Sequence, residues 1–172
     1  MLYQKYIRLV QDHAEQLTKI WINEVKKNPS TIGYRKLSDE ELSRRIYDVY
    51  KRLGKWIMRN DPLNRESAEH FVKLGKERAV ENFQVSEVIY ALILSRVVMW
   101  QYILDQGVIN TFIDFQQALD FYKLVTSFFD KAVYFVAVGY ETTAHVHEEK
   151  PKDKDFVEKA VKSITGWLIK EN

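Results

Sequence analysis

The sequence predicts an all-α protein, a bundle of about five long helices followed by a short C-terminal helix. Glycine and proline are scarce, at six and three of 172 residues. Apolar residues recur at three- and four-residue steps over most of the chain, which is the helical period. No segment alternates apolar and polar residues as a half-buried strand does. The length fits one domain, and an apolar share of 46% can fill a large core.

The first helix is predicted over about residues 2–27, where one apolar stripe runs along its length. The stripe consists of Tyr3, Ile7, Val10, Ala14, Leu17, Trp21 and Val25. Asn28-Pro29 ends this helix, because the residue before a proline disfavours helical conformation. A loop that contains Gly33 is expected to follow.

The second helix is predicted from about Asp39, because Ser38 and Glu41 have the spacing of a capping box. Its inner face is Leu42, Ile46, Val49, Leu53 and Trp56. Along one side this helix carries Arg44, Lys51, Arg52, Lys55 and Arg59. They form either a solvated face or a docking face for an acidic partner.

The third helix is predicted over about 65–82, and the fourth, over about 86–106, is nearly all apolar. A helix that is apolar all round belongs at the centre of a protein, so the fourth helix should be the central one. It should stop at Gly107, because glycine readily adopts the left-handed conformation that ends helices.

The long fifth helix opens at Thr111-x-x-Asp114 and carries two apolar registers. The main stripe, expected in the core, is Phe112, Phe115, Leu119, Tyr122, Val125, Phe129, Val133, Val136 and Tyr140. The second register is Phe121, Phe128 and Phe135. A second apolar face indicates either central burial or a homodimer interface.

The chain divides into a helical domain over 1–147, a charged linker over 148–155 and an amphipathic helix over 156–172. Lys and Arg number 26 against 24 Asp and Glu, so the net charge of +2 predicts no nucleic-acid partner. Glu87 and Arg96 interrupt the longest apolar run, and the N-terminus lacks a signal-peptide core. We therefore expect a cytoplasmic protein that does not insert into membranes.

No catalytic or cofactor motif is found in the sequence. It has no cysteine, no Glu-x-x-His pair for a di-iron bundle, no nucleophile elbow and no phosphate-binding glycine loop. We expect no enzyme activity and no cofactor. The alternative is a haem- or metal-binding helical protein that uses His70, or His145 and His147. His13 and His70 have charged neighbours, so a solvent-facing position is the simpler account of both.

Arg96 is the charged residue most in need of a partner, because a lone charge on a buried helix is very costly. Glu87 or the acids of the third helix are possible partners. Arg96 forms either a structural ion pair or an anchor for an anionic ligand or partner. We predict a ligand pocket at Arg78, Glu87, Arg96 and Trp100.

Three segments, Leu37–Leu42, Leu74–Ala79 and Val85–Leu92, resemble the N-terminal domain of RsbRD-type co-antagonists of the stressosome. The resemblance covers about residues 10–141. It implies an all-helical sensory or scaffolding module that usually precedes an output module such as a STAS domain. Related stressosome sensor domains have globin-like folds without haem and form dimers. The resemblance supplies no catalytic residues.

Too little chain follows the predicted linker for an output domain, so either the module acts on a signalling partner in trans or this sequence is part of a longer protein. The sequence thus predicts a non-catalytic bacterial signalling module. It should form a homodimer, with a possible small-ligand pocket among the third, fourth and fifth helices.

Overall fold

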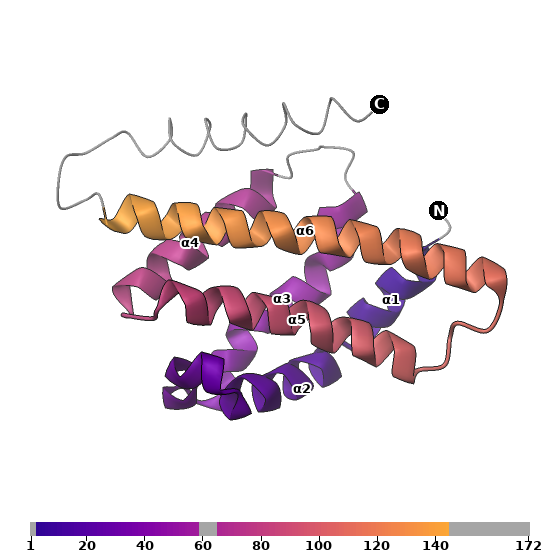
Figure 1. The fold of residues 1–172 in the computed structure, drawn as a ribbon, viewed down its shortest axis with the longest axis horizontal. Helices are drawn as coiled ribbons and strands as arrows, with labels where there is room; N and C mark the ends of the chain where they lie inside the picture. Colours follow the sequence, from indigo (N-terminus) through magenta and orange to yellow (C-terminus); the bar gives the residue numbers. More distant parts are fainter. Residues whose placement is uncertain (1–2, 59–64, 145–172) are drawn as a thin grey trace.

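Six α-helices and one 3-10 helix make up the described part of the chain (Figure 1). The computed structural model describes residues 3–58 and 65–144. The elements are α1 (Gln4–Asp12), α2 (Ala14–Lys27), η1 (Pro29–Lys36), α3 (Asp39–Met58), α4 (Arg65–Val80), α5 (Val85–Asp105) and α6 (Phe112–Ala144). No strand occurs in these residues, and the all-α class is confirmed. The predicted linker and C-terminal helix lie outside the described residues.

The first predicted helix is divided into α1 and α2 at His13. The Leu9 carbonyl O accepts the His13 backbone N–H at 3.2 Å and also lies 2.9 Å from His13 Nδ1. A side chain that binds into the backbone ladder is a known cause of helix kinks. The apolar stripe continues across the break, with Val10 and Ala14 both buried.

The segment after α2 forms the 3-10 helix η1, where a loop was predicted. Pro29 occupies its first turn, and the Asn28 side chain accepts a hydrogen bond from Ser30 N at 2.9 Å. The Thr31 hydroxyl donates to Val25 O at 2.7 Å and is buried. These local bonds order the segment and place Tyr34 in the core.

The apolar helix α5 lies in the middle of the fold. In Figure 1 it runs between α6 and α2, and it also contacts α1, η1 and α4. On its buried side, the Trp21 indole N–H donates to Ala91 O at 2.9 Å and the Tyr50 hydroxyl donates to Ser95 O at 3.1 Å. Among the described helices, α5 alone is long and apolar enough to cross a membrane, but half of its most apolar stretch is buried, as in a core helix.

Helices α4 and α6 cross with their backbones in contact at two glycines. A Cβ atom on Gly75 would lie 2.2 Å from Val136 O, and one on Gly139 would lie 2.3 Å from Val72 O. Side chains do not fit at either position, so the two glycines allow the backbones of α4 and α6 to approach each other closely.

The two apolar registers of α6 have different positions from those predicted. The first part of the main stripe, Phe112, Phe115, Leu119 and Tyr122, is exposed, and burial begins at Val125. The second register is in the core: Phe121, Phe128 and Phe135 are 0, 8 and 4% exposed. Phe121 stacks on Tyr6 of α1 at 5.6 Å between ring centroids, and Phe128 stacks on Trp56 of α3 at 5.8 Å. These phenylalanines are core residues. The open face of α6 is therefore not the face that was predicted to form the dimer interface.

Candidate functional site

The predicted pocket residues lie in two places rather than one. Arg78 and Glu87 flank the turn between α4 and α5, whereas Arg96 and Trp100 lie further along α5 beside α6. The turn itself requires an unusual backbone, because Asn82 has a φ of 60°. Asparagine is among the few non-glycine residues that tolerate this left-handed conformation.

Arg78 is the most buried cation near this turn, with its side chain only 7% exposed. Its Nη1 lies 2.9 Å from Glu81 Oε2. Arg45 of α3 holds the same carboxylate with two bonds, Nη1 to Oε2 at 2.9 Å and Nη2 to Oε1 at 3.2 Å. Partial burial opposes ionisation of Glu81, but the Arg45 hydrogen bond and the Arg78 charge outweigh it and lower its pKa. Glu81 therefore joins α3 to the end of α4.

Glu87 ties η1 to the start of α5. Its Oε1 accepts the Gly33 backbone N–H at 2.6 Å, and its Oε2 accepts the Gln84 N–H at 3.2 Å. A Cβ atom on Gly33 would lie 2.8 Å from Glu87 Oε2, so glycine leaves room for the carboxylate in this position. Both carboxylate oxygens are occupied by backbone donors, and Glu87 does not pair with Arg96.

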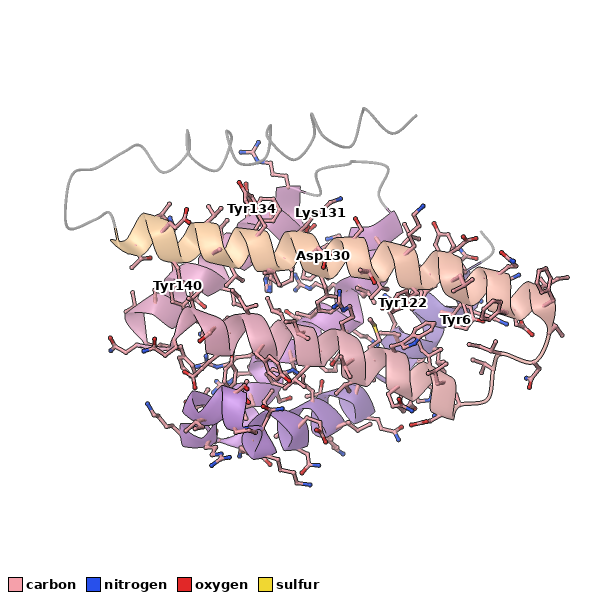
Figure 2. All side chains as sticks on the ribbon, in the orientation of Figure 1. Tyr6, Tyr122, Asp130, Lys131, Tyr134 and Tyr140 are labelled. Atoms are coloured by element: carbon pink, nitrogen blue, oxygen red, sulfur yellow. The ribbon has the colours of Figure 1, made fainter. Side chains whose placement is uncertain are left out.

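Two tyrosines complete this cluster from opposite sides. Tyr34 of η1 is buried against Trp21 and Phe83, with ring centroids at 6.0 and 5.0 Å, and its burial raises its pKa despite the nearby arginines. Tyr140 of α6 donates its hydroxyl to Phe83 O at 3.0 Å, and burial raises its pKa to about 12. Figure 2 shows Tyr140 near the beginning of α5. We call Tyr34, Arg45, Arg78, Glu81, Glu87 and Tyr140 the corner cluster.

An internal cavity and a surface groove meet at the two arginines of this cluster. The cavity has a volume of about 20 Å³, and Tyr34, Arg45, Arg78 and Ser95 are among its lining residues. That volume holds about one water molecule. The groove lies between α3 and α4 and has a volume of about 360 Å³. Arg45, Leu74 and Arg78 line both spaces.

Arg96 and Trp100 belong to the outer face of α5 and α6. Arg96 Nη1 lies 3.3 Å from Asp130 Oδ1 of α6, so its partner is not one of the acids that the sequence suggested. The Trp100 ring lies 4.8 Å from the Tyr122 ring between centroids, and Figure 2 shows Tyr122 between the two helices. Arg96 forms a structural ion pair, which was one of the two predicted interpretations.

Apolar side chains surround this contact and are open to solvent. Val97 and Leu104 of α5 are 52 and 45% exposed, and Phe115 and Leu119 of α6 are 49 and 44% exposed. We call Val97, Trp100, Leu104, Phe115, Leu119 and Tyr122 the α5–α6 strip. Sequence reasoning missed it because the α6 residues had been assigned to the core.

Of the histidines named from the sequence, the structure describes His13 and His70. His70 packs against Trp56 and Phe71, with ring centroids at 5.2 and 5.1 Å, and burial lowers its pKa, so it is not solvent-facing as predicted. His13 likewise packs on Tyr102 at 5.6 Å. No group of three or more His, Asp or Glu side chains that could hold a metal ion occurs in residues 3–58 and 65–144. His145 and His147 lie outside those ranges.

One of three comparisons with known proteins finds a match. The model of the family described as "RsbT co-antagonist protein rsbRD N-terminal domain" matches residues 15–148. No curated protein and no solved structure matches the chain. The match spans most of the chain and includes α2 to α6. The chain belongs to the family of RsbT co-antagonist protein rsbRD N-terminal domains.

Proposed function

We propose that this chain is a non-catalytic cytoplasmic signalling module that forms a homodimer through the α5–α6 strip and acts on a protein partner in trans. Family membership supports a regulatory role in a stressosome-type system. The observation that carries the dimer is the row of large apolar side chains left open on α5 and α6. Contiguous apolar surface of this kind typically marks a protein interface.

The strip is continuous because α5 and α6 are antiparallel. Arg96 pairs with Asp130 and Trp100 with Tyr122, so residue numbers rise along α5 as they fall along α6. Leu104, one turn beyond Trp100, is therefore level with the part of α6 that carries Leu119. The apolar side chains of the two helices form one surface.

The strip also has the properties that a twofold dimer requires. In such a dimer the same patch of both copies meets, so each patch must complement itself. Apolar side chains satisfy this condition directly. The Arg96–Asp130 pair borders the strip and offers both signs of charge, with the Asp130 side chain 68% exposed. A second copy can therefore pair with both residues at the rim.

Molar mass in solution tests the dimer. We expect the protein to have twice the chain mass of 20.4 kDa in light scattering behind size exclusion. Leu119→Asp should weaken association at least roughly hundredfold, because it buries an unpaired charge in the interface. Val80→Asp is the matched control, since Val80 is 72% exposed on α4 and is not part of the strip. A wild-type protein that is monomeric at every concentration contradicts the proposal, as does equal dissociation by both variants.

The corner cluster supports the sensory part of the proposed role. It joins η1, α3, α4, α5 and α6 through part-buried and exposed polar contacts, and α5 extends from this cluster to the strip. A ligand that binds one arrangement of these helices more tightly would shift their populations and alter the dimer face. Dimer dissociation constants measured with and without a candidate ligand should then differ.

A further inference from the structure

The buried Arg78 guanidinium has most of its hydrogen-bonding capacity unused. A guanidinium carries five N–H donors. With the residues that the structure describes, Arg78 makes one hydrogen bond, to Glu81, and a longer ion pair at 3.9 Å to Glu77. Buried charged groups normally have their donors satisfied, because an unmet donor keeps its full desolvation cost. The groove and the cavity are the spaces from which a further partner can reach Arg78.

The α3–α4 groove has an excess of positive charge. Its cations are Arg44, Arg45, Lys73 and Arg78, and its acids are Glu41, Glu77 and Glu81. Each acid already has partners: Glu41 caps α3 through Ser38 N at 2.8 Å, Glu77 lies 3.7 Å from Lys73, and Glu81 binds the two arginines. Arg44 forms no ion pair with any described residue. The groove volume of about 360 Å³ is within the range of small-molecule sites.

The hydrogen bonds of the Glu81 carboxylate indicate which chemical groups this groove can bind. Arg45 already holds its carboxylate with two parallel bonds, and Arg78 adds a third from α4. This is the forked geometry in which arginine recognises carboxylates and phosphates. The site is thus built around one oxyanion of the chain itself, while Arg44 and the remaining Arg78 donors are available for another.

We propose that the α3–α4 groove binds a small molecule through a phosphate or carboxylate group, which Arg44 and Arg78 hold beside the Glu81 carboxylate. His70 lines the same groove, and its buried Nε2 has no hydrogen-bond partner in the described residues. The proposal names the ligand class for the sensory role above and rests on that role. It does not depend on the α5–α6 strip.

Titration with inorganic phosphate at constant ionic strength tests the site, with isothermal calorimetry as the readout. Wild type should bind phosphate saturably. Arg44→Gln should bind roughly tenfold more weakly, because a charge-assisted contact is lost. Glu81→Gln should bind more tightly, because the competing negative charge is removed. Arg8→Gln, an exposed α1 variant outside the groove, should bind as wild type does.

Arg44→Gln is expected to weaken phosphate binding and Glu81→Gln to strengthen it. Structural damage would instead weaken phosphate binding in both variants, so the two causes can be distinguished. Phosphate should also raise the melting temperature of Glu81→Gln more than that of wild type. A parallel titration with acetate distinguishes a phosphate site from a carboxylate site. Absence of saturable binding of either anion, or equal weakening by Arg44→Gln and Arg8→Gln, overturns the proposal. Molar masses measured on the same samples report separately on the dimer.

Discussion

At the scale of single residues, Asp114 has a strongly lowered pKa. It accepts hydrogen bonds from Lys5 Nζ of α1 and from Thr111 Oγ1, the latter at 2.8 Å. The Lys5 bond is the main cause that lowers its pKa to about 2. The contact ties the start of α6 to α1, and the Tyr6 hydroxyl reinforces it by donating to Asp114 O at 2.9 Å.

The sign of the resulting pH dependence follows from this lowered pKa. An unfolded aspartate has a pKa of about 3.9. The stabilisation is therefore fully present above about pH 4 and is lost as the pH falls toward 2. We expect the free energy of unfolding in urea to fall less over this range in Asp114→Asn than in wild type. Asp120→Asn, an exposed change on the same helix, should retain the wild-type slope.

Asn82 gives a second prediction for a single residue. Its φ of 60° is costly for residues with a Cβ atom, by about 1 kcal/mol for alanine relative to glycine. Asn82→Gly should therefore unfold at equal or higher urea concentration than wild type, and Asn82→Ala at lower concentration. If both variants were equally destabilised, the Asn82 side chain rather than its backbone would be the important feature.

At the scale of elements, the α4–α6 crossing is the contact least tolerant of change. An added Cβ at Gly75 or Gly139 meets backbone atoms, which cannot move aside as a flexible side chain can. We expect Gly75→Ala and Gly139→Ala each to lower the free energy of unfolding by about 3 kcal/mol. Gly107→Ala is the control: nothing lies within 4 Å of its added Cβ, and only its φ of 61° opposes the change, by about 1 kcal/mol. Equal losses at all three positions would contradict the steric explanation.

The helices themselves could be predicted because their signals are local. The Ser38–Glu41 and Thr111–Asp114 boxes are both formed, and Gly107 ends the turn after α5 with a positive φ. Periodicity also identified the buried face of α3. The break at His13 was missed, because it depends on one ring binding a carbonyl rather than on a helix-breaking residue.

Which face of α6 is buried could not be read from the sequence. Both of its registers are apolar, and the choice depends on the angle at which α6 crosses α1, α3 and α4. The aromatic partners Tyr6 and Trp56, far away in the sequence, select the register of Phe121 and Phe128. The partner of Arg96 depends on the same choice, because Asp130 faces α5 only in this orientation.

Of the corner cluster, only Arg78 and Glu87 were named from the sequence as pocket residues, and their role in binding a ligand stays a prediction. Both were predicted to line one ligand pocket, and both make hydrogen bonds at the turn between α4 and α5. Their partners Arg45 and Gly33 come from α3 and η1, and no sequence spacing connects those positions to the turn after α4. Arg96 and Trp100 share a helix with Glu87 but lie toward α6, so one predicted pocket becomes two surfaces.

At the scale of the whole molecule, the proposed dimer forms where two copies meet at the α5–α6 strip. Helix α5 is covered on several sides by the chain itself, yet Val97 and Leu104 remain open beside the exposed half of the α6 stripe. A second copy would complete the burial that the apolar composition of α5 predicts.

Site-specific crosslinking tests this claim most directly, because the chain contains no cysteine. Single changes Phe115→Cys, Leu119→Cys and Tyr122→Cys place a thiol on the strip, and Val80→Cys places one on exposed α4 as the control. With a short bismaleimide at micromolar protein, we expect covalent dimers from at least one strip variant and none from Val80→Cys. Monomer alone from all strip variants, or equal dimer yield from Val80→Cys, would contradict it.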